Sequence, residues 1–440
     1  MTDARHTTVS RADTLHGSSA SAGDRYEAHR PGPLSGLRVV EVSSFVATPL
    51  CGLTLAQLGA DVIRVEPLGG GPDRTRWPLT ADGASLYWNG LNPGKRAVEV
   101  DLADPRGRRL VAELVVGGGP AGGILVTNVG RWDELTYRSL SSRRADVIRV
   151  QLMGRYDGGT AVDYTVQAGT GFPLITGPEG HGAPVNHVLP AWDLAAGLYL
   201  ATGLLAAELR RRGTGRGAEV QVALEDVALA TAGQLGHLAQ AQLRPEEERR
   251  ADGNFVYGTF GTDFVTADGQ RFMLVALTPR QWADLLQVTG LSATVDALGK
   301  ALGADFADEG DRYRHRRVLA GLVAEWFARH DADQVREVLA TTRLLWSPYR
   351  GFADLVADDA RLLREHPLFE TADQPGIGPL LVPGSPVTLD GRRGRAAPAP
   401  AVGQHTRQVL TEEGGLSTAE FDELVALGVV RRPAPREAAG

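Results

Sequence analysis

Short runs of β-branched residues alternate with longer apolar segments through the first half of this chain. The run at 37–42 is followed by an apolar segment at 47–58 and by a second β-branched run at 61–66. Pro49 stands near the start of the apolar segment and Gly59 just after its end. Proline in the first turn and glycine after the last turn are typical of a helix. The pattern predicts a strand, a helix and a parallel strand joined by a right-handed crossover.

The same alternation continues to about residue 243. Asp104 and Pro105 open a segment in the way that a capping residue and a first-turn proline open a helix. The further predicted elements are strands at 97–102, 123–129, 146–152 and 217–224, and helices at 105–116, 194–212 and 225–243. Strands and helices in this order are typical of a Rossmann-like, doubly wound α/β domain.

The second half has a different pattern. The charged run at 244–250 indicates a linker, and the segment 260–276 indicates a hairpin, followed by two or three helices to about residue 342. The first thirty residues lack the apolar segment of a secretory signal. The predicted organisation is a disordered leader at 1–33, a large α/β domain at 34–243, a smaller α+β domain at 244–360, and a return to the large domain at 361–440.

Composition and charge narrow the range of partners. Of the 440 residues, 43% are hydrophobic, which is enough for a large buried core, and the formal net charge is -7. A net negative field favours neither nucleic acid nor a membrane surface, and no apolar run approaches the length of a membrane span. Cys51 is the single cysteine, which excludes an internal disulfide and a cysteine metal cluster and fits a reducing cytoplasm.

Several common cofactor and catalytic motifs are missing. The turn after the first strand reads Ser-Ser-Phe-Val-Ala-Thr at 43–48, without the G-x-G-x-x-G of a dinucleotide site, so we do not expect NAD. No P-loop, H-E-x-x-H or G-x-S-x-G sequence occurs. His181 and His187 have no carboxylate at ligand spacing, so no metal site is predicted.

Asp193 is the first candidate for chemistry. It stands in the sequence Pro-Ala-Trp-Asp-Leu-Ala-Ala-Gly at 190–197, before a long Leu/Ala/Gly helix and with no lysine or arginine nearby in sequence. A shielded carboxylate next to free backbone N–H groups has what a carboxylate nucleophile needs. Aspartate is also a common helix cap. These residues alone leave both roles open.

Several ordered segments carry a resemblance to a known family. They are Leu-Arg-Val-Val-Glu-Val at 37–42, Leu-Gly-Ala-Asp-Val-Ile-Arg-Val-Glu at 58–66, Asn-Pro-Gly-Lys-Arg-Ala at 92–97, Asp-Leu-Ala-Asp-Pro-Arg-Gly at 101–107, Thr-Gly-Arg-Gly at 214–217 and Gly-Gln-His-Thr at 403–406. In this order, from about Pro33 to Val430, the chain resembles the class III CoA-transferases. The resemblance implies an interlocked homodimer, and no cofactor beyond the coenzyme A that is part of the substrate.

In that family the catalytic aspartate precedes the helix that leads to the Thr-Gly-Arg-Gly turn, and it matches Asp193. The resemblance implies that Asp193 attacks an acyl-CoA thioester to form a mixed anhydride, becomes an aspartyl-CoA thioester, and passes CoA to an acceptor carboxylate. The apolar neighbours Trp192 and Leu194 would keep water from the anhydride. Family racemases place a histidine where this chain has Val162, which carries no proton, so racemisation is not expected.

The family match also places CoA at the switch point of the large domain. The residues that it implies in CoA or substrate binding are Phe45, Val46, Ala47, Val100, Asn128, Val129 and Arg131. Arg138 is a further phosphate candidate, and both arginines are equally compatible with a plain surface position. Pro67 replaces the family's basic residue after the second strand.

Part of the chain is similar to family members that move CoA between the two carboxyl groups of one mesaconyl-CoA molecule. The similar segments are 47–52, 73–79, 185–193 and 253–261. A dicarboxylate requires a second anion site, and the arginines of 73–77 together with His187 are candidates for it. Two alternatives stay open: CoA transfer between a short dicarboxylic acyl-CoA and a free acid, and a CoA-binding protein without catalytic activity.

Overall fold

The computed structural model describes residues 32–247, 249–357, 363 and 365–432. The leader predicted at 1–33 therefore lies almost wholly outside the described residues. Within the described ranges, none of the helices combines the length and the hydropathy that crossing a lipid bilayer requires.

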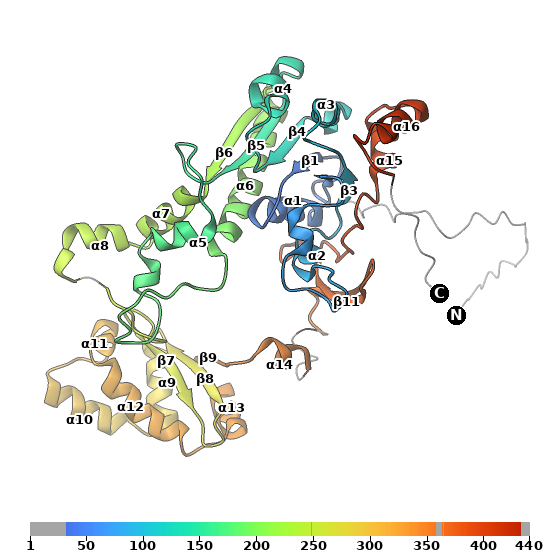
Figure 1. Cartoon of the computed structure of the whole chain (residues 1–440). Coiled ribbons are helices and arrows are strands. Elements are labelled where there is room, and N and C mark those ends of the chain that lie inside the picture. Colours follow the sequence, from blue (N-terminus) through green and yellow to red (C-terminus); the bar gives the residue numbers. More distant parts are fainter. Residues whose placement is uncertain (1–31, 248, 358–362, 364, 433–440) are drawn as a thin grey trace, which may run out of the picture.

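A six-stranded parallel sheet forms the centre of the first half of the chain (Figure 1). Its strands are β1 (Arg38–Val42), β2 (Asp61–Glu66), β3 (Arg96–Glu99), β4 (Ile124–Thr127), β5 (Ile148–Met153) and β6 (Ala218–Ala223). They lie in the order β3-β2-β1-β4-β5-β6, and every neighbouring pair is parallel. The order reverses between β1 and β4, so the carboxyl ends of these two strands flank the crevice in which such sheets bind ligands.

Helices pack on both faces of this sheet, which confirms the prediction of an α/β fold with a parallel sheet. The helices up to α6 are α1 (Ala47–Gln57), α2 (Leu86–Leu91), α3 (Pro105–Val116), α4 (Tyr137–Arg143), α5 (Asp163–Ala168) and α6 (Ala191–Thr214), and of these α1 and α6 pack on one face and α3 and α4 on the other. On one face, Leu55 of α1 and Leu200 of α6 pack against the strands, together with the buried thiol of Cys51. On the other face, Val111 and Val115 of α3 are buried.

The helix boundaries predicted in this half are confirmed in part. The helix α3 begins after Asp104, whose carboxylate accepts the N–H of Arg106 (2.7 Å), as the sequence indicates. The segment predicted as one helix at 225–243 instead forms two, α7 (Leu224–Gln234) and α8 (His237–Leu243). The reason is Gly236, which adopts a left-handed conformation with φ 81° and interrupts the helix.

A smaller unit follows, and its sheet is antiparallel. The hairpin predicted at 260–276 is confirmed as β7 (Phe260–Val265) and β8 (Arg271–Ala276), and β9 (Leu345–Pro348) pairs with β8. Its helices are α9 (Pro279–Thr289), α10 (Ser292–Leu302), α11 (Glu309–Arg314), α12 (Arg316–Phe327) and α13 (Ala332–Ala340). The prediction of two or three helices is wrong, because Gly290 and Gly303 end α9 and α10 in left-handed caps and divide the apolar stretch into short helices.

The last part of the chain packs against the large sheet. The elements after β9 are α14 (Phe352–Ala357), the hairpin of β10 (Phe369–Gln374) and β11 (Gly378–Pro383), the short strands β12 (Thr388–Leu389) and β13 (Arg392–Arg393), and the helices α15 (Thr406–Gln408) and α16 (Thr418–Ala426), of which the last two lie against the sheet. Figure 1 shows α15 and α16 near β3 and α3. Val409, Phe421 and Val429 are buried in the same core as Val98 of β3. The domain boundaries drawn from the sequence stay a prediction.

Candidate active site

Asp193 lies where α6 begins, close to the turn that follows β1. It is the third residue of the helix, and one turn later Gly197 lies so near α1 that a Cβ atom there would be 2.7 Å from the carbonyl oxygen of Ala47. Glycine permits this approach because it has no Cβ. Trp192, next to the nucleophile candidate, is buried in one cluster with Ala47. The packing of α6 on α1 therefore brings Asp193 to the turn 45–47.

Asp163, rather than Asp193, caps α6. Its Oδ2 atom accepts the backbone N–H groups of Trp192 (2.8 Å) and Asp193 (3.1 Å), whereas Pro190 before the helix provides no side-chain cap. These are two of the donors that the first turn of a helix leaves unpaired. Asp163 thus performs the capping role that the sequence left open for Asp193. The Asp193 carboxylate does not cap the helix.

The electrostatic surroundings of Asp193 favour a reactive carboxylate. The pKa of Asp193 is raised to about 6, first by burial and then by the charge of Asp163, while Arg76 acts in the opposite direction. Burial and a neighbouring negative charge both destabilise an ionised carboxylate. Formation of a neutral acyl bond removes this charge and is therefore favoured. Sequence reasoning missed Asp163 and Arg76 as neighbours of Asp193 because the fold brings them from other segments.

Aromatic side chains form one wall beside the nucleophile candidate. The ring of Trp192 lies 5.2 Å from that of Phe172 and 6.0 Å from that of His187, measured between centroids. The Nδ1 atom of His187 is 2.6 Å from the carbonyl oxygen of Leu189, so the imidazole is engaged by its own loop. An aromatic wall of this kind limits the access of water to a reactive acyl intermediate.

The turn after β1 has the backbone strain that is common at functional sites. Phe45 has a φ of 67°, which costs a residue with a side chain about 1–3 kcal/mol, and its ring is 44% exposed. Val46 and Ala47 are buried, and α1 starts at Ala47. Phe45 is therefore the exposed residue of this turn, while Val46 and Ala47 pack into the core.

Asn128 joins the turn after β4 to the turn after β1. Its side-chain Nδ2 donates to the carbonyl oxygen of Ser44 (2.9 Å), and the N–H of Val129 donates to the hydroxyl of Thr127 (2.9 Å). The Oδ1 atom of Asn128 is buried without a partner among the described residues. The turn after β4 is thus held against the turn after β1 at the switch point of the sheet, and the CoA contacts of Phe45, Asn128 and Val129 stay a prediction.

Three other predicted binding residues are placed differently. The strand predicted at 97–102 ends at Glu99, and Val100 is fully buried in the core, where it forms a bridge with Val430. Its side chain is therefore enclosed by the core, and the CoA contact that the family match implied for Val100 stays a prediction. Arg131 lies 4.9 Å from the ring of Trp132, and Arg138 is exposed on α4.

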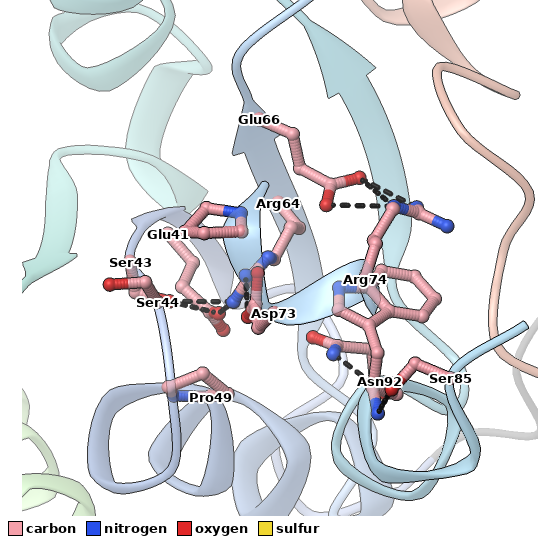
Figure 2. A network of polar contacts seen from close by, with 12 residues as sticks. Glu41, Ser43, Ser44, Pro49, Arg64, Glu66, Asp73, Arg74, Ser85 and Asn92 are labelled. Carbon is pink, nitrogen blue, oxygen red and sulfur yellow. Dashed lines mark hydrogen bonds and ion pairs between the residues drawn. The ribbon is translucent and has the colours of Figure 1, made fainter. Parts of the chain in front are cut away.

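A buried network of charges lies beneath the turn after β1 (Figure 2). Glu41 of β1 bonds to Arg64 of β2 (2.6 Å) and to Lys95 (2.9 Å), and Arg64 also bonds to Asp73 (2.9 Å). All four side chains are at most 1% exposed. The Lys95 ammonium also donates to the carbonyl oxygen of Pro49 at 2.7 Å. The network ties the first two strands, the start of α1 and the segment 72–75 into one rigid support.

The chain belongs to CoA-transferase family III, whose family model matches residues 34–406. The chain is 47% identical over 404 residues to 2-methylfumaryl-CoA isomerase of Chloroflexus aurantiacus, covering 91% of this chain and 98% of that protein. It is 28% identical to succinyl-CoA:mesaconate CoA-transferase of Haloarcula hispanica, covering 89% and 100%.

A solved structure has the same fold. The crystal structure of a CAIB/BAIF family protein from Brucella suis superposes with a TM-score of 0.71 at 24% identity, covering 87% of this chain and all of that one. Membership of a family of transferases supports an enzyme over a protein that merely binds CoA.

Proposed function

We propose that this protein moves CoA between the two carboxyl groups of 2-methylfumaryl-CoA (mesaconyl-CoA) within one molecule, with Asp193 as the covalent nucleophile. The observation that carries this proposal is a desolvated Asp193, relieved of helix capping by Asp163, beside the switch point of the sheet. The 47% identity to 2-methylfumaryl-CoA isomerase supports the choice of substrate.

The first half of the proposed cycle removes CoA from one end of the acid. An Asp193 oxygen bonds to the thioester carbonyl carbon, the C–S bond breaks, and CoA leaves as the thiolate. The thiolate then bonds to the carboxyl carbon of Asp193 and breaks the anhydride on that side. The acid therefore departs with the bridging oxygen, and CoA remains on Asp193 as a thioester.

The second half returns CoA to the other end. The second carboxylate of the same acid attacks the Asp193 thioester and expels the thiolate, and the thiolate then attacks the newly activated acyl carbon. Asp193 is released as a carboxylate that keeps one oxygen from the substrate. The four exchanges balance without a net proton or electron, so the proposed reaction needs no cofactor beyond CoA itself.

Isotope exchange tests whether the transfer is intramolecular. Labelled free mesaconate is added while the enzyme converts unlabelled mesaconyl-CoA, and the CoA esters are analysed by mass spectrometry. We expect the product ester to stay unlabelled, because the released acid is recaptured before it leaves the site. Label in the product would instead establish transfer between a dicarboxylic acyl-CoA and a free acid.

The pH dependence of Asp193 acylation tests the role of the two carboxylates. The reactive form is ionised, so the rate is expected to be retained above about pH 6 and to fall as the pH drops through about 6. Asp163→Asn keeps an oxygen that can accept both N–H groups but removes the charge, so the midpoint of this fall should move to lower pH. The measurement is kcat/KM against pH.

Asp163→Ala is the companion to that variant. It removes the cap as well as the charge, so we also expect it to lower the stability of the protein by about 0.5–2 kcal/mol. A midpoint that stays in place in Asp163→Asn would contradict the electrostatic role of Asp163.

We further propose that CoA lies along the turns 45–47 and 128–129, with Arg131 near its phosphates, in a cytoplasmic homodimer. Exposed leucines support the dimer, because a second copy would remove them from water. They lie on or beside the consecutive helices α6, α7 and α8: Leu209, Leu235, Leu238 and Leu243. Sedimentation equilibrium measures the mass directly, and a monomer would rule the dimer out.

A further inference from the structure

The two arginines of the segment 73–77 have different surroundings. Arg74 bonds to Glu66 through Nε (3.0 Å) and Nη2 (2.6 Å), and its guanidinium lies 3.5 Å from the ring centroid of Trp88. Figure 2 shows the bonds between Arg74 and Glu66. Arg76 has no carboxylate within ion-pair distance in the part of the chain that the structure describes. Arg74 is therefore structural, and Arg76 is the arginine left to bind an anion.

Arg76 is held in place by aromatic rings and by its own backbone. Its guanidinium lies 5.3 Å from the ring centroid of Phe45 and 5.4 Å from that of Tyr87. Its carbonyl oxygen accepts the hydroxyl of Ser85 (2.6 Å), and the same hydroxyl accepts the N–H of Trp88 (3.1 Å) at the start of α2. Ser85 therefore fixes Arg76 relative to α2, the helix that carries Tyr87.

Tyr87 provides a second donor in the same place. Its hydroxyl oxygen is buried without a hydrogen-bond partner among the described residues, an arrangement that a bound acceptor would satisfy. The pKa of Tyr87 is raised to about 12, chiefly by burial, so the hydroxyl keeps its proton at neutral pH. The charges of Arg76 and Asp193 both act on Tyr87, and Arg76 also acts on Asp193, so the three groups lie near one another.

We propose that Arg76 and Tyr87 form the binding site for the free carboxylate of a short dicarboxylic acyl-CoA and hold the released acid between the two transfers. This inference rests on the proposed function and assigns the second anion site that a dicarboxylate requires. The planar guanidinium offers two parallel N–H donors to a carboxylate, and Tyr87 adds an O–H donor. His187, the other candidate for this site, is engaged by Leu189 instead.

The two donors also account for retention of the acid. When the thiolate opens the anhydride, the acid becomes a dianion, whose distal carboxylate is still bound by Arg76. The acid then turns within the site, so that its two carboxylates exchange places: the newly released one binds Arg76, and the one that Arg76 held meets the Asp193 thioester. Without this anchor the dianion would leave the site and exchange with free acid, and the enzyme would act between molecules.

A comparison of two thioesters tests the anchor. Acylation of Asp193 is measured in single turnovers, by trapping with hydroxylamine, for mesaconyl-CoA and for methacrylyl-CoA, which lacks the second carboxylate. In Arg76→Gln we expect the ratio of the two acylation rates to fall roughly 10- to 100-fold, because a charge-assisted hydrogen bond is lost. Both thioesters meet the same Asp193, so a change in its pKa cancels in the ratio.

Two further variants complete the test. Tyr87→Phe removes a single oxygen and is expected to lower the ratio roughly 3- to 10-fold. This variant tests the anchor independently if Arg76→Gln does not fold. Arg210→Gln, at the far end of α6 and exposed, is the matched control and should leave the ratio unchanged. In Arg76→Gln, labelled free mesaconate should also enter the product ester.

The outcomes separate the two proposals. Acylation with both thioesters and an unchanged ratio in Arg76→Gln and Tyr87→Phe would overturn the anchor and leave Asp193 as the nucleophile. Failure of the wild-type protein to be acylated by either thioester would overturn the proposed function, and the anchor with it.

Discussion

Replacing Asp193 by alanine is expected to lower the turnover of mesaconyl-CoA by roughly 10⁴- to 10⁶-fold, the range found when single members of the catalytic triad of a serine protease are removed. Each bond exchange of the proposed cycle passes through this carboxylate, so no other side chain substitutes for it. The measurement is the rate of isomer formation by mass spectrometry, with the wild-type protein as reference.

Oxygen labelling identifies the residue independently of the rate. In the proposed cycle one substrate carboxylate oxygen stays on Asp193, so substrate labelled with ¹⁸O should transfer the isotope to the peptide that contains Asp193. An unlabelled Asp193 after many turnovers would refute the covalent mechanism, as would normal turnover by Asp193→Ala.

Stability provides the control for this experiment. Folding raises the pKa of Asp193 to about 6. Above that pH the carboxylate is ionised in both states, and because its ionised form is more stable in the unfolded chain, it destabilises the folded protein. This penalty disappears below the unfolded pKa, where both states are protonated. Asp193→Asn removes the penalty, so at neutral pH it should unfold at the same or a higher temperature than the wild type while remaining inactive.

Replacing Glu41 by alanine is expected to destabilise the protein by about 3–5 kcal/mol, the loss typical when one partner of a buried ion pair is removed. Glu41 is fully buried between Arg64 and Lys95, so its removal would leave the buried Lys95 without its carboxylate and Arg64 with Asp73 alone. Burial already lowers the pKa of Lys95 to about 8, so loss of Glu41 would favour the neutral amine further. The measurement is the urea midpoint of unfolding.

A matched substitution on the surface is the control. Glu370 pairs with Arg395 at 2.9 Å, but both side chains are well exposed, so Glu370→Ala should cost at most about 1 kcal/mol. Equal effects of the two substitutions would contradict the role assigned to the buried network. Since Asp73 in this network anchors the segment that leads to Arg76, residual folded Glu41→Ala protein should also discriminate less between mesaconyl-CoA and methacrylyl-CoA.

The sequence by itself determined the parallel-sheet class and the identity of the nucleophile candidate. Alternating β-branched runs and capped apolar segments are local signals, because each strand or helix repeats its own hydrophobic period. For the same reason α3 and the hairpin of β7 and β8 are where the pattern predicts them. Asp193 was found from its place before a helix, and the family resemblance, confirmed by the match over 34–406, assigned its role.

The tertiary structure alone decided what surrounds Asp193 and which polar groups are available. The helix cap by Asp163, the opposing charge of Arg76 and the unpartnered hydroxyl of Tyr87 join segments that are far apart in the chain, so no local period encodes them. From the sequence alone, the arginines of 73–77 are equivalent candidates for anion binding. In the folded protein Arg74 forms an ion pair with Glu66, whereas Arg76 has no ion-pair partner among the described residues. Long-range packing and electrostatics, unlike local patterning, depend on which surfaces meet after folding.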